Sequence, residues 1–359
     1  MDLGSTLTVV KVEAFLGGNP LMKLEGTNWR MSKITYAVQA YCGLLLLYDT
    51  ELLVKSIVEQ EFAIFGTGIP QFWLTSLIGK INVQLLLFSI CITNITRGRL
   101  FSNVLKDLCC VHNYYSKTPF DKKGNKAWIW PIVPQVCIVL ATLCTWSAAS
   151  QDVMIPLVTN LVTVVSTTAM DASKIAMLLC FKKTYKMFND RMDSMRFESE
   201  LDDADLARRI STLGHHYRTL RRAVDGFNAF FGLSVLLQLS STILATLGFL
   251  TQVTLTDLPI NVYNNVVTPK VISIVTIILC SDSVLEEAEK SVFISLELSE
   301  RLPWQSQKRT EIFSLTQTCK DYAPEFSVLG LFCIKRSTIL DLFNITSTLM
   351  IVLVQSRNV

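Results

Sequence analysis

Residues 229–250 read AFFGLSVLLQLSSTILATLGFL and contain no charged side chain. A helix needs about 20 consecutive apolar residues to cross the hydrocarbon core of a bilayer. This stretch is long enough, and it lacks the strict polar and apolar alternation of a transmembrane β-strand. It therefore predicts a membrane-spanning helix and an integral membrane protein.

The composition of the chain agrees with this prediction. The chain has 359 residues, of which 50% are hydrophobic and 18% are charged, and its mean hydropathy is +0.39. Soluble domains carry roughly 25% charged residues. These values exclude a soluble enzyme, a disordered protein and a collagen-like fibre.

Similar apolar stretches recur along the chain and predict an all-α fold with seven transmembrane helices. Trp128 and Trp130 open the third stretch, as expected for an aromatic belt at the membrane interface. Pro269 and Lys270 leave the start of the sixth stretch open. The predicted spans are about 34–54, 72–96, 128–149, 153–181, 229–250, 264–285 and 337–356.

The distribution of lysine and arginine predicts the orientation of the chain. Of the 33 Lys and Arg residues, 28 lie in segment 1–33 or in the connections after the second, fourth and sixth spans. Because such an excess marks the cytosolic side of a membrane protein, we expect a cytosolic N-terminus and a short extracellular tail, 357–359. The net charge of +3 follows from these connections and does not indicate a nucleic-acid-binding surface.

The connection before the fifth span predicts a helix that projects into the cytosol over about 201–228. Its apolar residues recur at alternating spacings of four and three and form one seam that continues into the span. The sixth span is expected to continue similarly until Pro303 ends it. Together with segment 286–336 these helices predict a cytosolic anchor bundle; the alternative is an amphipathic helix on the membrane surface. The seam consists of Leu206, Ile210, Leu213, Tyr217, Leu220, Val224, Phe227 and Phe231.

The seventh span has one polar face within an apolar helix. At about 100° per residue, the residues of this face fall within about 80° of arc. Such a face suits a helix that lines water, or a seam that joins helices in lipid through hydrogen bonds, and periodicity alone leaves both open. We call it the polar face; it comprises Ser337, Asp341, Asn344, Thr348, Ile351 and Gln355.

The same helix resembles the insect gustatory receptor family. The family signature there is a Thr-Tyr pair, five apolar residues and then Gln-Phe. Thr348 and Gln355 match at the right spacing, whereas Leu349 replaces the Tyr and Ser356 replaces the Phe. Two further stretches are similar to the family, namely GLFCIKR at 330–336 and segment 217–237 with Asn228, Phe231 and Gly232.

This resemblance implies a taste receptor that is itself a ligand-gated, non-selective cation channel of four subunits, alone or with other gustatory receptor subunits. In such receptors the seventh helices surround a central pore and the cytosolic helix ends anchor the tetramer. Here Gln355 and Ile351 would form the gate, and Asp341 would concentrate cations. We expect a plasma-membrane receptor of sensory neurons, for plant-derived bitter compounds.

The resemblance also places a tastant pocket among the outer halves of the second to sixth spans. Aromatic walls with a few polar groups suit a small organic ligand. The plain alternatives are interfacial anchoring for the aromatic residues and snorkelling for Lys80. Asp171 and Lys174, three residues apart, predict an ion pair. The pocket candidates are Trp73, Lys80, Trp146, Asp152, Asn160, Thr163, Gln252, Tyr263 and Asn264.

No sequence feature indicates catalysis. The three histidines, His112, His215 and His216, all lie in predicted cytosolic connections, and Cys109-Cys110 lacks zinc-ligand spacing. There is no phosphate-binding loop or nucleophile elbow. We therefore expect no enzyme activity, no cofactor and no metal.

Two other functions compete with the channel. A metabotropic seven-helix receptor would have an extracellular N-terminus, which the charge distribution opposes. A secondary transporter usually shows two related halves and charged midplane sites, and no internal repeat is visible.

Overall fold

The computed structural model describes residues 22–25, 28–31, 51, 54, 85, 88, 96–115, 154–195, 203–255, 261–301 and 306–357. The first three predicted spans therefore lie outside the described residues, apart from single positions. The number of membrane crossings and the orientation of the termini stay predictions.

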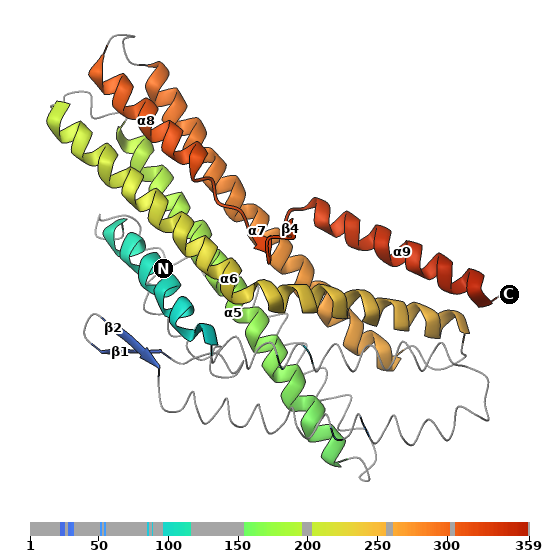
Figure 1. Ribbon diagram of the computed structural model, residues 1–359. Helices are drawn as coiled ribbons and strands as arrows, with labels where there is room; N and C mark the ends of the chain where they lie inside the picture. The colour runs from blue at the N-terminus through green and yellow to red at the C-terminus, as the bar shows by residue number, and fades with distance from the viewer. Residues whose placement is uncertain are drawn as a thin grey trace.

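Three long helices form the framework: α5 (Met154–Ser194), α6 (Asp203–Leu255) and α7 (Asn261–Glu300). At 1.5 Å per residue, the 53 residues of α6 extend over about 80 Å, more than twice the thickness of a bilayer core. Each helix thus contains one predicted span and continues beyond it. In Figure 1 the three helices run together at the upper left and diverge toward the lower right.

One helical stretch of the described chain, Ala204–Leu250, is long and apolar enough to cross a membrane, and Ser337–Val352 is a shorter apolar helix. The first of these contains the fifth predicted span, and the second lies in the seventh.

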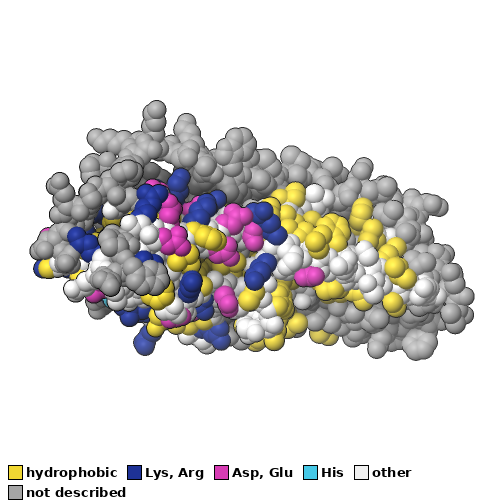
Figure 2. Space-filling view, turned by 90° about the horizontal axis from the view of Figure 1, so that it is seen from above, with side chains coloured by type: hydrophobic (Ala, Val, Ile, Leu, Met, Phe, Trp, Pro, Cys, Tyr) yellow, Lys and Arg dark blue, Asp and Glu magenta, His cyan; other side chains and the backbone are white. Residues whose placement is uncertain are grey.

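The helix ends at the upper left of Figure 1 pack together with α8 (Gln307–Asp321). The helix over 96–115 joins them through the ring contacts of Phe101 with Phe230 of α6 and of Tyr115 with Phe188 of α5. We call this assembly the charged bundle; it comprises 96–115, 182–195, 203–231, 286–300 and 307–321. The name reflects the distribution of side chains in Figure 2, where charged side chains gather over one end of the molecule and hydrophobic ones over the other.

The core of the charged bundle is the apolar seam of α6. All eight residues of the predicted seam are buried, and Tyr217, Leu220, Val224 and Phe231 are completely inaccessible. The seam therefore faces protein, and α6 is not an amphipathic helix lying on a membrane. Close packing also requires Gly226, since a Cβ atom there would lie 2.5 Å from Cγ2 of Val104.

Two small antiparallel hairpins depart from the predicted all-α fold. One pairs β1 (Met22–Glu25) with β2 (Asn28–Met31), and the other pairs β3 (Ser327–Val328) with β4 (Phe332–Cys333). The second hairpin turns through Leu329 (φ 52°) and Gly330 (φ 73°), the positive dihedral angles of a type I′ turn. The strands of this second hairpin have only two residues each and carry no periodic pattern, so the sequence did not reveal it. The chain then continues into α9 (Ser337–Arg357).

Candidate functional site

The last helix, α9, touches the rest of its own chain along one face. It lies against α6 and α7, and its less exposed positions recur every four residues. Thr338 is buried, and Leu342, Thr346 and Met350 are half-buried. We call these four residues the contacting face. They hold a helix that otherwise projects away from the charged bundle, as Figure 1 shows.

The polar face lies on the opposite side of α9. At about 100° per residue, its centre is about 160° from the centre of the contacting face. All six of its side chains are exposed in the single chain. The polar face therefore points away from the other described helices, where water or further copies of the chain can meet it.

The chemistry of the polar face suits cations and not anions. Asp341 contributes a carboxylate, Asn344 and Gln355 contribute amides, and no Lys or Arg lies on the face. The Thr348 hydroxyl donates its hydrogen to the Asn344 carbonyl at 2.8 Å. Its oxygen therefore remains available as a hydrogen-bond acceptor and cation ligand. Hydrated cations are attracted by such carboxylate and carbonyl-type oxygens.

The hairpin before α9 is held by one face of α6. The Asn228 amide donates to the Glu325 carbonyl at 2.6 Å, and its oxygen accepts from the Ser327 backbone N–H at 3.2 Å. One turn further on, Gly232 leaves room for Leu329, whose backbone nitrogen would lie 3.1 Å from a Cβ atom there. Asn228 and Gly232 are two of the residues that carried the family resemblance, and the structure shows that both contact the segment leading into α9.

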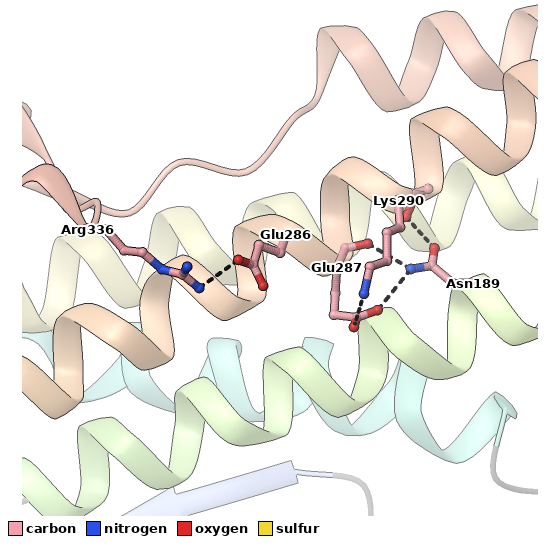
Figure 3. A network of polar contacts seen from close by, with 6 residues as sticks. Asn189, Glu286, Glu287, Lys290 and Arg336 are labelled. Atoms are coloured by element: carbon pink, nitrogen blue, oxygen red, sulfur yellow. Dashed lines mark hydrogen bonds and ion pairs between the residues drawn. The ribbon is translucent and has the colours of Figure 1, made fainter.

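A polar cluster joins α7 to α5 on the side of α7 away from α9 (Figure 3). The Asn189 amide donates to the Glu287 carbonyl at 2.7 Å, and the Ser291 hydroxyl donates to the Asn189 side-chain oxygen at 2.6 Å. The Glu287 carboxylate also pairs with Lys290 at 2.8 Å. Sequence reasoning missed this cluster, because Asn and Ser within a long helix give no signal of their partner.

The predicted ion pair of Asp171 and Lys174 is present, with 3.0 Å between Lys174 Nζ and Asp171 Oδ1. Gln238 of α6 completes it: the amide oxygen accepts from Lys174 at 2.9 Å, and the amide nitrogen donates to Asp171 at 2.7 Å. All three side chains are buried. Gln238 was missed, although a lone amide in the charge-free stretch 229–250 is a signal for a polar partner.

Comparison with known proteins identifies the chain. The sequence model of the 7tm chemosensory receptor family matches residues 132–357. The chain belongs to the 7tm chemosensory receptor family. No curated protein matches its sequence. The receptor is similar in fold to the insect olfactory receptor OR5 from Machilis hrabei, with a TM-score of 0.66 and 11% identity over 99% of this chain and 98% of that one. The OR5 structure in complex with eugenol matches with a TM-score of 0.58, also at 11% identity and over 99% and 98% of the two chains.

The structure leaves the tastant pocket of this receptor a prediction. Four of the candidates, Trp73, Lys80, Trp146 and Asp152, lie outside the described residues. The others lie on described helices, near the ends of these helices that are remote from the charged bundle. Asn160 and Thr163 are on α5, Gln252 is near the end of α6, and Tyr263 and Asn264 are in the first turn of α7.

The histidines of the receptor lie in the charged bundle, where His112 and His216 are buried. Nδ1 of His112 lies 3.3 Å from the Thr184 hydroxyl, which donates to the Cys180 carbonyl, so His112 is the donor of that pair. Burial lowers the pKa of His112 to about 4. His216 lies 2.9 Å from the Tyr115 hydroxyl, and burial, aided by His215, lowers its pKa as well. Within the described part of the receptor, no group of three His, Cys, Asp or Glu could hold a metal ion.

Proposed function

We propose that this receptor is a ligand-gated, non-selective cation channel whose pore is lined by the polar face of α9. The observation that carries the proposal is the opposition of the two faces of α9. The contacting face meets the receptor's own helices, and the polar face is exposed in the single chain. A polar face on an otherwise apolar membrane helix needs water or protein against it.

Four copies around an axis would give every polar face an aqueous surface to line. Asp341 would then form a ring of four carboxylates that raises the local cation concentration. Ile351, which is 56% exposed in the single chain, would form a hydrophobic constriction that closes by dewetting, next to the Gln355 amides. Other gustatory receptor subunits can take positions in such an assembly.

The orientation in this proposal follows from charge. With the positively charged connections inside, the N-terminus and the charged bundle are cytosolic, and α9 ends at the outer surface. The charged bundles of the four copies then anchor the tetramer beneath the membrane. The receptor resides in the plasma membrane of sensory neurons.

The proposed ligands are small organic tastants, above all plant-derived bitter compounds. The support for small molecules is the structural relative OR5 from Machilis hrabei, which has been seen in complex with eugenol. The support for taste is the last-helix signature, with Thr348 and Gln355 in place. The tastant opens the pore by binding the open arrangement better than the closed one, which shifts the population between them.

Outside-out patch recording tests this proposal. Patches from cells that express the receptor at the surface would be exposed to plant alkaloids, glycosides and sugars, with no nucleotide in the pipette. We expect a ligand-evoked cation current in the isolated patch. Signalling in intact cells together with silent patches would contradict the proposal and favour the metabotropic alternative. Ligand uptake without current would favour a transporter.

A further inference from the structure

Arg336, the residue immediately before α9, is bound to α7 by two carboxylates. Its Nε lies 2.5 Å from Oδ2 of Asp282, and its Nη2 lies 2.7 Å from Oε1 of Glu286. The two carboxylates are four residues apart, so both lie on one face of α7. Figure 3 shows the guanidinium reaching from the start of α9 toward Glu286.

The position of Arg336 is not explained by the stability of α9 itself. A cation at a helix N-terminus is unfavourable, because the helix dipole places positive partial charge there. The backbone N–H of the preceding residue, Lys335, is already satisfied by the Thr338 hydroxyl at 3.2 Å. The two carboxylates of α7 are therefore what holds the Arg336 side chain in place.

α7 is fixed to α5 from its other side. Glu287 follows Glu286 directly, yet its carbonyl and carboxylate face Asn189 of α5. Because consecutive residues of a helix point about 100° apart, Glu286 and Glu287 contact different neighbours at the same height of α7. Figure 3 shows the two contacts on adjacent residues of α7: Glu286 meets Arg336, and Glu287 meets Asn189. A displacement of α7 would therefore act on the start of α9 through one turn of helix.

We propose that Arg336 is a positioning residue that couples movement of α7 to α9 through Asp282 and Glu286, and so sets how effectively a ligand opens the pore. This inference rests on the proposed channel function. Ligand binding among the outer halves of the helices displaces α7, and the two ion pairs pull the start of α9 with it. Without them, part of the displacement is lost between the two helices, so more ligand is needed and the maximal current is smaller.

The test compares concentration–response curves of matched variants in outside-out patches. The probe is the plant alkaloid that evokes the largest wild-type current. The variants are Arg336→Gln, the double variant Asp282→Asn/Glu286→Gln, and the triple variant that combines them. Lys335→Gln is the control. Lys335 is exposed and adjoins Arg336 in the sequence, so this substitution also removes one positive charge. Surface labelling of each variant normalises the maximal current.

The Arg336→Gln and the double variant should each raise the half-maximal concentration about threefold to tenfold, as expected when a residue between two coupled sites is altered. The triple variant should shift no further than either, within about twofold, because all three changes remove one interaction. The control should stay within about twofold of wild type. A variant that only destabilised the fold would lower surface labelling without moving the half-maximal concentration.

An unshifted Arg336→Gln variant would overturn the coupling, and so would a triple variant whose shift is the product of the two separate shifts. If Arg336→Gln fails to reach the surface, Arg336→Lys provides the same test with a smaller expected shift, because one ammonium cannot bridge both carboxylates as the guanidinium does. A wild-type receptor that signals in intact cells but carries no current in the isolated patch would overturn the proposed function, and the coupling with it. Wild-type current with unshifted variants would overturn the coupling alone.

Discussion

Lys174 of α5 and Gln238 of α6 are joined by a hydrogen bond of 2.9 Å, and both also bind the Asp171 carboxylate. The three side chains form a closed triangle in which each is bound to the other two. It ties α5 to α6 within the predicted spans, where an unpaired charge is costly.

Removing one charge of this triangle should destabilise the receptor strongly. The Asp171→Asn substitution leaves the Lys174 ammonium, which is 1% exposed, without a counter-charge, and should cost about 3–5 kcal/mol. The triple variant Asp171→Leu/Lys174→Met/Gln238→Leu should recover most of this loss, since no buried charge is then left. The measurement is the midpoint of heat denaturation of the detergent-solubilised receptor. Equal midpoints for wild type and Asp171→Asn would contradict the account.

Gly226 of α6 is expected to tolerate no side chain. A Cβ atom there would lie 2.5 Å from Val104, and because Val104 is 2% exposed, it has little room to move. We expect Gly226→Ala to destabilise the receptor by about 1–3 kcal/mol. Val104→Ala in the Gly226→Ala background should restore part of the loss, although it is destabilising by itself. Heat denaturation and surface expression both measure this, and additive losses in the double variant would refute the proposed clash.

His112 should make the receptor less stable in acid. Its pKa is about 4 in the folded receptor and 6.5 in the reference state. Between these values the unfolded chain binds a proton that the folded receptor does not, so the free energy of unfolding falls as the pH falls. The loss is on the order of 2 kcal/mol at pH 5. His216, whose pKa is also lowered, acts in the same pH range.

The matched variant for this prediction is His112→Gln, which keeps a polar group near Thr184 but does not titrate. Its denaturation midpoint should fall less than that of wild type between pH 7 and pH 5, as expected from the proton linkage. A remaining slope from His216 is expected. Identical slopes for the two proteins would show that His112 does not contribute.

The long helices could be predicted from the sequence because their pattern repeats many times. The seam from Leu206 to Phe231 contains eight apolar residues at helical spacing, and burial of all eight is confirmed. The pair of Asp171 and Lys174 was predictable because its members lie three residues apart on one helix. Each of these signals comes from residues that lie close together in the sequence, on one helix, and such patterns can be recognised in a single sequence.

The contacts between distant segments could not be predicted in this way. Arg336 is recognisable in the sequence only as one positive charge of a predicted cytosolic connection, because its partner Glu286 lies 50 residues earlier. The two hydrogen bonds of Asn228 to Glu325 and Ser327 depend on how α6 and residues 325–327 meet in space. The hairpin itself has strands of only two residues. Its turn includes Leu329 at φ 52°, and a positive φ is uncommon for a leucine, so the sequence does not indicate it.

The central claim is that the polar face of α9 lines an ion pathway, and two threonines of this helix test it most directly. Thr348 lies on the polar face and is exposed, whereas Thr346 lies on the contacting face and is half-buried. Each would be replaced by cysteine, and a cationic thiosulfonate reagent would be applied to open receptors in outside-out patches. The account predicts that the reagent irreversibly reduces the current of Thr348→Cys and leaves that of Thr346→Cys unchanged. Block of Thr346→Cys with no effect on Thr348→Cys, or no effect on either, would contradict it.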